Sequence, residues 1–70
     1  MDFDDCNKTG IYEYHGYIGK YQPDIIAYYD FGILIVFKTE TYRLQILFVG
    51  SNNTLLYRFN ERDWNVISKV

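Results

Sequence analysis

The chain has 70 residues, 49% of them hydrophobic and 20% aromatic, with seven basic and nine acidic side chains and a net charge of −2. This length allows a single domain, the apolar content argues against intrinsic disorder, and the lone Cys6 excludes an internal disulfide and a zinc site of several thiolates. No apolar stretch approaches the ~18 residues of a membrane-spanning helix, and the acidic start is unlike a secretory signal. We therefore expect a cytoplasmic protein that does not enter a membrane.

The first third of the chain predicts an acidic tail followed by an extended segment. Residues 1–9 carry three aspartates and are expected to form a flexible tail. Residues 10–21 are extended, either as a hairpin that turns at Gly16 or as one long strand with a bulge at Gly16 or Gly19. Residues 22–24, which include the only proline, end this segment.

Short apolar runs separated by turn residues continue along the chain. Strands are expected at residues 25–29, 33–37, 42–49 and 54–59. The run at 33–37 has five consecutive apolar residues, which predicts a central strand covered on both faces with Ile35 in the middle of the core.

The last eleven residues are expected to form a helical or type I turn at 60–64 and then a short closing strand. The fold class is thus all-β: a small antiparallel meander of five to six strands, as a curled sheet or small barrel, with one short C-terminal helical turn. A sheet this small and this apolar on both faces must curl on itself, be covered, or pair with another copy. The weakly charged segment 10–21 could make that homo-oligomer by pairing edge to edge.

Gly10-Ile11-Tyr12 followed by Tyr17-Ile18-Gly19 resembles the signature of the GIY-YIG nucleases. The resemblance implies metal-dependent DNA cleavage, with the two halves on adjacent strands, a tyrosine that helps activate water, an arginine and a metal-holding glutamate. Arg43 and Glu61 are the residues available for the last two roles. The four residues between the halves are fewer than the family has, and the segments around Arg43 and Glu61 do not predict the helices that carry those roles.

Other residue patterns predict no catalytic, cofactor or metal site. His15 is the only histidine, and no serine or aspartate can be placed with it as a catalytic set. Lys38, Arg43, Arg58 and Arg62, with Tyr57 and Trp64, could form a stacking platform for single-stranded nucleic acid. This small nucleic-acid-binding barrel is the alternative function, and the overall acidity weakens it.

The uneven charge favours a protein partner. The first 35 residues hold six of the nine acidic side chains and six of the eight tyrosines. An acidic, tyrosine-rich surface suits a partner protein with a basic surface. Residue usage (one alanine, one proline, many Ile, Asn and Tyr) is typical of AT-rich genomes, including those of phages and viruses. We therefore expect a non-enzymatic protein-binding module, in its most concrete form a phage- or virus-encoded inhibitor of a host nucleic-acid enzyme, acting in the host cytoplasm.

Alternation along residues 10–21 places Tyr12 and Tyr14 toward the core. The opposite side then faces outward and carries the candidate binding surface, unless a bulge at Gly16 shifts the register. The residues expected to bind the partner are Glu13, His15, Tyr17, Tyr21, Asp24 and Asp30.

Overall fold

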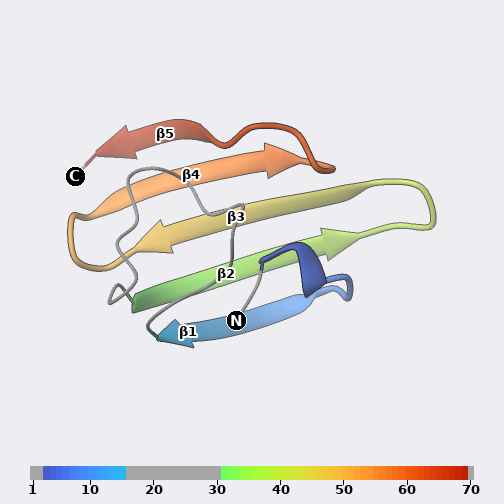
Figure 1. Cartoon of the computed structure of the whole chain (residues 1–70), viewed down its shortest axis with the longest axis horizontal. Coiled ribbons are helices and arrows are strands. Elements are labelled where there is room, and N and C mark those ends of the chain that lie inside the picture. The colour runs from blue at the N-terminus through green and yellow to red at the C-terminus, as the bar shows by residue number, and fades with distance from the viewer. Residues whose placement is uncertain (1–2, 16–30, 70) are drawn as a thin grey trace.

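The computed structural model describes residues 3–15 and 31–69. These residues form one antiparallel sheet whose strands follow one another in chain order (Figure 1). The elements are the 3-10 helix η1 (Phe3–Asp5) and the strands β1 (Gly10–His15), β2 (Phe31–Lys38), β3 (Arg43–Val49), β4 (Thr54–Phe59) and β5 (Asn65–Lys69). The expectation of an all-β meander is confirmed, in the form of an open sheet rather than a closed barrel. The helical turn lies at the N-terminal end of the described chain, whereas a turn without helix precedes β5.

Local turn chemistry explains where the central strands end. Between β2 and β3, the backbone N–H of Thr39 donates to the carbonyl of Tyr42 at 2.8 Å, and the Thr39 hydroxyl accepts from the Tyr42 N–H at 2.9 Å. Asn53 and Asn60 adopt left-handed backbone angles, with φ of 52° and 58°, in the turns that follow β3 and β4. Asparagine tolerates this conformation better than most residues, so both positions suit a sharp reversal of the chain. The predicted strand at residues 25–29 lies outside the described residues.

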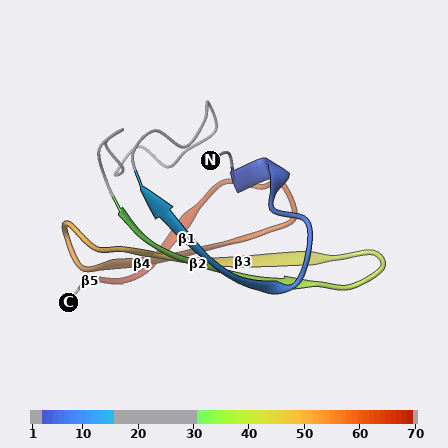
Figure 2. The ribbon, with the colours of Figure 1, turned by 90° about the horizontal axis from the view of Figure 1, so that it is seen from below.

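One face of the sheet, here called the covered face, is buried under the N-terminal segment. Figure 2 shows η1 on this side of the sheet. Phe3 is almost fully buried and makes edge-to-face contacts with Tyr14, at 5.4 Å between ring centroids, and with Trp64, at 5.6 Å. The remaining buried apolar residues of this layer are Cys6, Leu34, Val36, Leu47, Val49 and Leu56.

The covered face also carries polar side chains that hold the N-terminal segment in place. Gln45 Nε2 donates to the backbone carbonyl of Phe3 at 2.8 Å, and Arg43 Nη1 donates to the carbonyl of Asp4 at 3.0 Å. Arg58 donates through Nε to Gln45 Oε1 at 2.6 Å and through Nη2 to the Asp4 carboxylate. An irregular segment laid on a sheet has backbone carbonyls without a ladder partner, and these side chains supply the donors. Phe3, Asp4 and Cys6 are therefore held against the sheet, in the segment for which the sequence predicts a flexible tail over residues 1–9.

The position expected for Ile35 is also wrong. Alternation along β2 turns Leu34 and Val36 toward the covered face, where both are fully buried, and turns Ile35 to the opposite face, where it is half-buried. A run of five apolar residues does not indicate which face of the strand is covered. In the described structure only one face of the sheet is covered.

Candidate protein-binding site

The face opposite η1, here called the open face, is a set of apolar rows that run across the strands. The first row, in order across the strands, is Phe37, Leu44 and Phe59. The second row is Ile11, Ile35, Ile46 and Tyr57. The third row is Glu13, Ile33, Phe48 and Leu55, and the fourth is His15 and Phe31. On β2, β3 and β4 these rows contain no charged residue.

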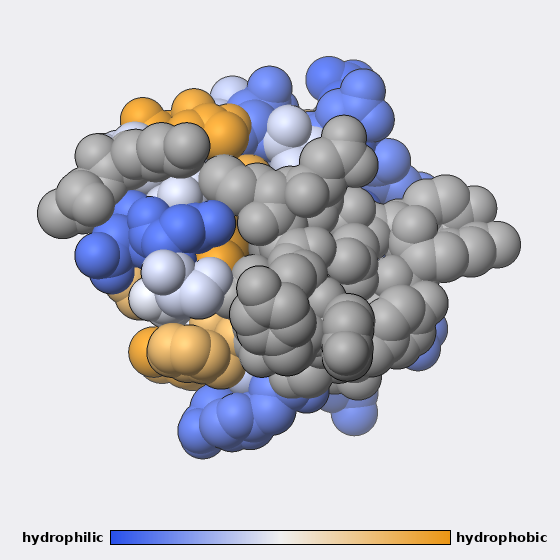
Figure 3. Space-filling model, turned by 60° about the vertical axis from the view of Figure 1, so that its left-hand side comes forward, coloured by the Kyte–Doolittle hydropathy of each residue, from blue (hydrophilic) through white to orange (hydrophobic). Residues whose placement is uncertain are grey.

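Many of these side chains are open to solvent. Ile11 is 77% exposed, Phe37 is 51% and Ile33 is 46%, whereas Ile35, Leu44, Ile46 and Leu55 are half-buried by their neighbours. Large apolar side chains that gather on one surface commonly mark an interaction site. Figure 3 shows apolar residues in orange at the surface, toward the end of the sheet where β1 ends.

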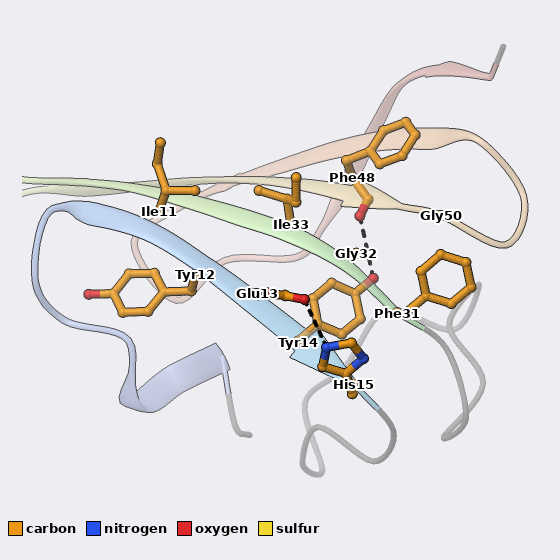
Figure 4. Close-up of a pocket in the computed structure, with 10 residues that line it drawn as sticks. All are labelled: Ile11, Tyr12, Glu13, Tyr14, His15, Phe31, Gly32, Ile33, Phe48 and Gly50. Atoms are coloured by element: carbon orange, nitrogen blue, oxygen red, sulfur yellow. Dashed lines mark hydrogen bonds and ion pairs between the residues drawn. The ribbon is translucent and has the colours of Figure 1, made fainter.

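An open hollow of about 580 Å³ lies at this end of the sheet (Figure 4). Its described lining residues are Ile11, Tyr12, Glu13, Tyr14, His15, Phe31, Gly32, Ile33, Phe48 and Gly50. Figure 4 shows Ile11, Ile33 and Phe48 pointing to one side of the strands, with Tyr12 and Tyr14 on the other. The hollow therefore extends the open face around the end of β1 and β2.

Among the described lining residues, Glu13 and His15 have ionisable side chains that lie next to each other. Glu13 Oε1 lies 3.0 Å from His15 Nε2, and both side chains are 75% exposed. At that exposure water screens the pair, so it adds little to stability. At the same exposure, the Glu13 carboxylate can also meet a basic group on a partner.

Tyr14 and Gly32 form the floor between the two faces. They are directly paired across β1 and β2, and the Tyr14 hydroxyl reaches past Gly32 to the carbonyl oxygen of Phe48, at 3.5 Å (Figure 4). A Cβ at position 32 would lie 2.9 Å from that hydroxyl and 1.9 Å from the Phe48 oxygen. Because Gly32 has no side chain, the Tyr14 side chain can pass over β2 and reach the Phe48 carbonyl on β3.

The structure places only part of the predicted binding surface. Glu13 and His15 are exposed and Tyr14 is buried, while Tyr12 packs against the edge of the core, so this part of β1 has the orientation that alternation predicts. The other four candidates, Tyr17, Tyr21, Asp24 and Asp30, lie outside the described residues. The structure adds the open face itself. The feature of the sequence that pointed to this face was the excess of apolar residues on both sides of the predicted strands.

The arginine platform expected for nucleic acid does not exist in this form. Arg43 and Arg58 are both buried on the covered face, and Arg58 stacks over Trp64 at 4.8 Å from the ring centroid. Their guanidinium groups bind the N-terminal segment, which leaves Lys38 and Arg62 as the exposed basic members of the set.

The structure describes only some of the residues singled out by the nuclease resemblance. Gly10, Ile11 and Tyr12 lie on β1, and residues 17–19 fall outside the described ranges. Arg43 is buried against backbone carbonyls, and its Nη2 lies 3.9 Å from the exposed carboxylate of Glu61. Within residues 3–15 and 31–69, no three His, Cys, Asp or Glu side chains are grouped as metal ligands.

Comparisons with family models, with curated proteins and with solved structures found no match to this chain. Among its described residues, no helix has the length and apolar character needed to cross a membrane.

Proposed function

We propose that this chain is a non-enzymatic protein-binding module that takes its partner on the open face. The observation that carries the proposal is the continuous apolar surface of β2, β3 and β4, bordered at one end by the hollow and the Glu13 carboxylate. Apolar side chains of a partner would supply most of the contact area, and a basic side chain opposite Glu13 would fix its orientation.

A narrower form of the proposal is an inhibitor of a nucleic-acid enzyme encoded by a phage or virus. Six acidic residues in the first half of the sequence support it, because the substrate groove of such an enzyme is basic. In this form Glu13 is the described acidic residue beside the hollow.

A capture experiment with two matched variants tests the proposal. Ile33→Lys places a charge in the third row. Ile67→Lys is the control, because it makes the same change at an isoleucine of similar exposure, 51%. Ile67 has no paired residue on β4, because it lies at the register shift between β4 and β5. We expect immobilised wild-type protein and Ile67→Lys to retain the same partner from a host lysate and Ile33→Lys to lose it. Glu13→Lys should weaken retention and reduce its dependence on salt.

Identical retention by wild type and Ile33→Lys would contradict the proposal, provided that thermal melts show the variants folded. Tight binding of a labelled single-stranded oligonucleotide that weakens steeply with salt would instead support the nucleic-acid alternative.

A further inference from the structure

We infer that the occupant of the open face is a second copy of this chain, packed sheet against sheet across a two-fold axis. This inference rests on the proposed function, because it names the partner of the same surface. Two antiparallel sheets that bury apolar faces pack about 10 Å apart with their strands nearly aligned. The resulting dimer is a sandwich in which each chain supplies one sheet.

The chemistry of the open face on β2, β3 and β4 fits a second copy of this chain better than a charged partner. Its central strands present only aliphatic and aromatic side chains, so nothing on β2, β3 or β4 would attract a basic or acidic surface. An apolar surface without charge is complementary to itself, and a two-fold interface requires that self-complementarity. With a net charge of −2 per chain, repulsion between copies is small.

The exposed apolar area of the open face lies at the upper end of the range for monomers and approaches what each chain buries in a standard dimer interface. The aromatic residues of the four rows are between 37% and 51% exposed, and a buried aromatic side chain covers about 150–250 Å², so they present on the order of 400 Å². Ile11 and Ile33 bring the surface to on the order of 600 Å². A typical monomer has no apolar patch larger than about 300–600 Å², and a standard interface buries about 800 Å² per partner. The backbone extends 33 by 22 Å in the plane of Figure 1, so the footprint is large enough.

The fold itself gains from such a cover. The described core of one chain is a single layer between the sheet and the short N-terminal segment, which is a small core even for this length. Covering the other face would complete the burial of Ile35, Leu44 and Ile46, which are half-buried in one chain. The stability of the protein should then depend on its concentration.

Sedimentation velocity over a wide range of protein concentration tests the inference, with the same matched pair. We expect the wild-type mass to rise from one chain to two and its thermal midpoint to rise with concentration. Ile33→Lys puts two charges into the interface, one per copy, and should raise the dissociation constant by at least about 100-fold. Ile67→Lys should leave it within about threefold of wild type. Phe37→Asp in the first row is a second variant, with its residue 51% exposed, in case Ile33→Lys does not fold.

A wild-type mass of one chain at every concentration would overturn the inference. So would a dimer that both face variants leave intact, because it would form through a strand edge. The wild-type protein could instead stay monomeric and capture a different protein, with Ile33→Lys abolishing the capture. That result would overturn the second copy as the partner and leave the proposed function standing. A monomer that captures no protein through the open face would contradict both this inference and the proposed function.

Discussion

The contact between Asp4 and Arg58 should carry a large share of the stability of the N-terminal segment. The Arg58 side chain is only 3% exposed and that of Asp4 27% exposed, so Asp4→Ala leaves a guanidinium buried without its counter-charge. Removing one member of a buried pair costs about 3–5 kcal/mol, and losing a hydrogen bond to a charged group costs about 1.5–3 kcal/mol. Because water can reach the Asp4 side, we expect a loss of about 3 kcal/mol, where the two ranges meet.

Thermal unfolding followed by circular dichroism measures this loss. For a domain of this size 1 kcal/mol corresponds to about 4–8 °C, so the midpoint of Asp4→Ala should fall by about 12–24 °C. Asp5→Ala is the matched control: it removes the same charge from the same 3-10 turn, but Asp5 is exposed. Its cost should stay within about 0.5 kcal/mol.

A double variant separates the effect of losing the ion pair from any effect of the substitution on the 3-10 turn. In the Asp4→Ala background, Arg58→Met removes the uncompensated charge and keeps an aliphatic side chain against Trp64, so part of the lost stability should return. Equal midpoints for Asp4→Ala and Asp5→Ala would refute the reasoning, since the segment would then not depend on the buried contact.

Two further pairs of substitutions test the packing of the sheet by chemical denaturation. Gly32→Ala should destabilise the fold by about 2 kcal/mol or more, because its Cβ would meet the Phe48 carbonyl, whereas Gly10→Ala has its nearest contact 3.6 Å away and should be tolerated. At concentrations where the chain is monomeric, Leu34→Ala should cost about 4 kcal/mol and Ile35→Ala about 1–2 kcal/mol. Equal losses in the glycine pair would contradict the close approach of the Phe48 carbonyl to Gly32, and equal losses for Leu34→Ala and Ile35→Ala would contradict the assignment of the two faces.

Much of the sheet follows from local sequence alone. The runs at 33–37, 42–49 and 54–59 are strongly apolar or alternating, and turn residues separate them, so strand positions and antiparallel order follow from short-range chemistry. The closing strand after residue 60 is predictable for the same reason. The orientation of β1 follows from its alternation, with Glu13 outward and Tyr14 inward.

The choice of which face is covered does not follow from local sequence. On β3, alternation separates Arg43 and Gln45 from Leu44 and Ile46, and the ordinary expectation is that the polar side faces water. The structure has the reverse, with Arg43 and Gln45 buried. This outcome depends on contacts with residues about 40 positions away, at the carbonyls of Phe3 and Cys6, which no periodicity records.

The reversal explains why the two faces carry such different side chains. A short N-terminal segment with one 3-10 turn brings few apolar groups but several backbone carbonyls, so the sheet beneath it must offer donors as well as hydrophobic contacts. Arg43, Gln45 and Arg58 are those donors. The open face faces no such requirement, and on β2, β3 and β4 it contains only apolar rows. A surface with few donors for backbone groups suits a cover that brings few such groups to satisfy: the side chains of another sheet, whose own backbone is already paired.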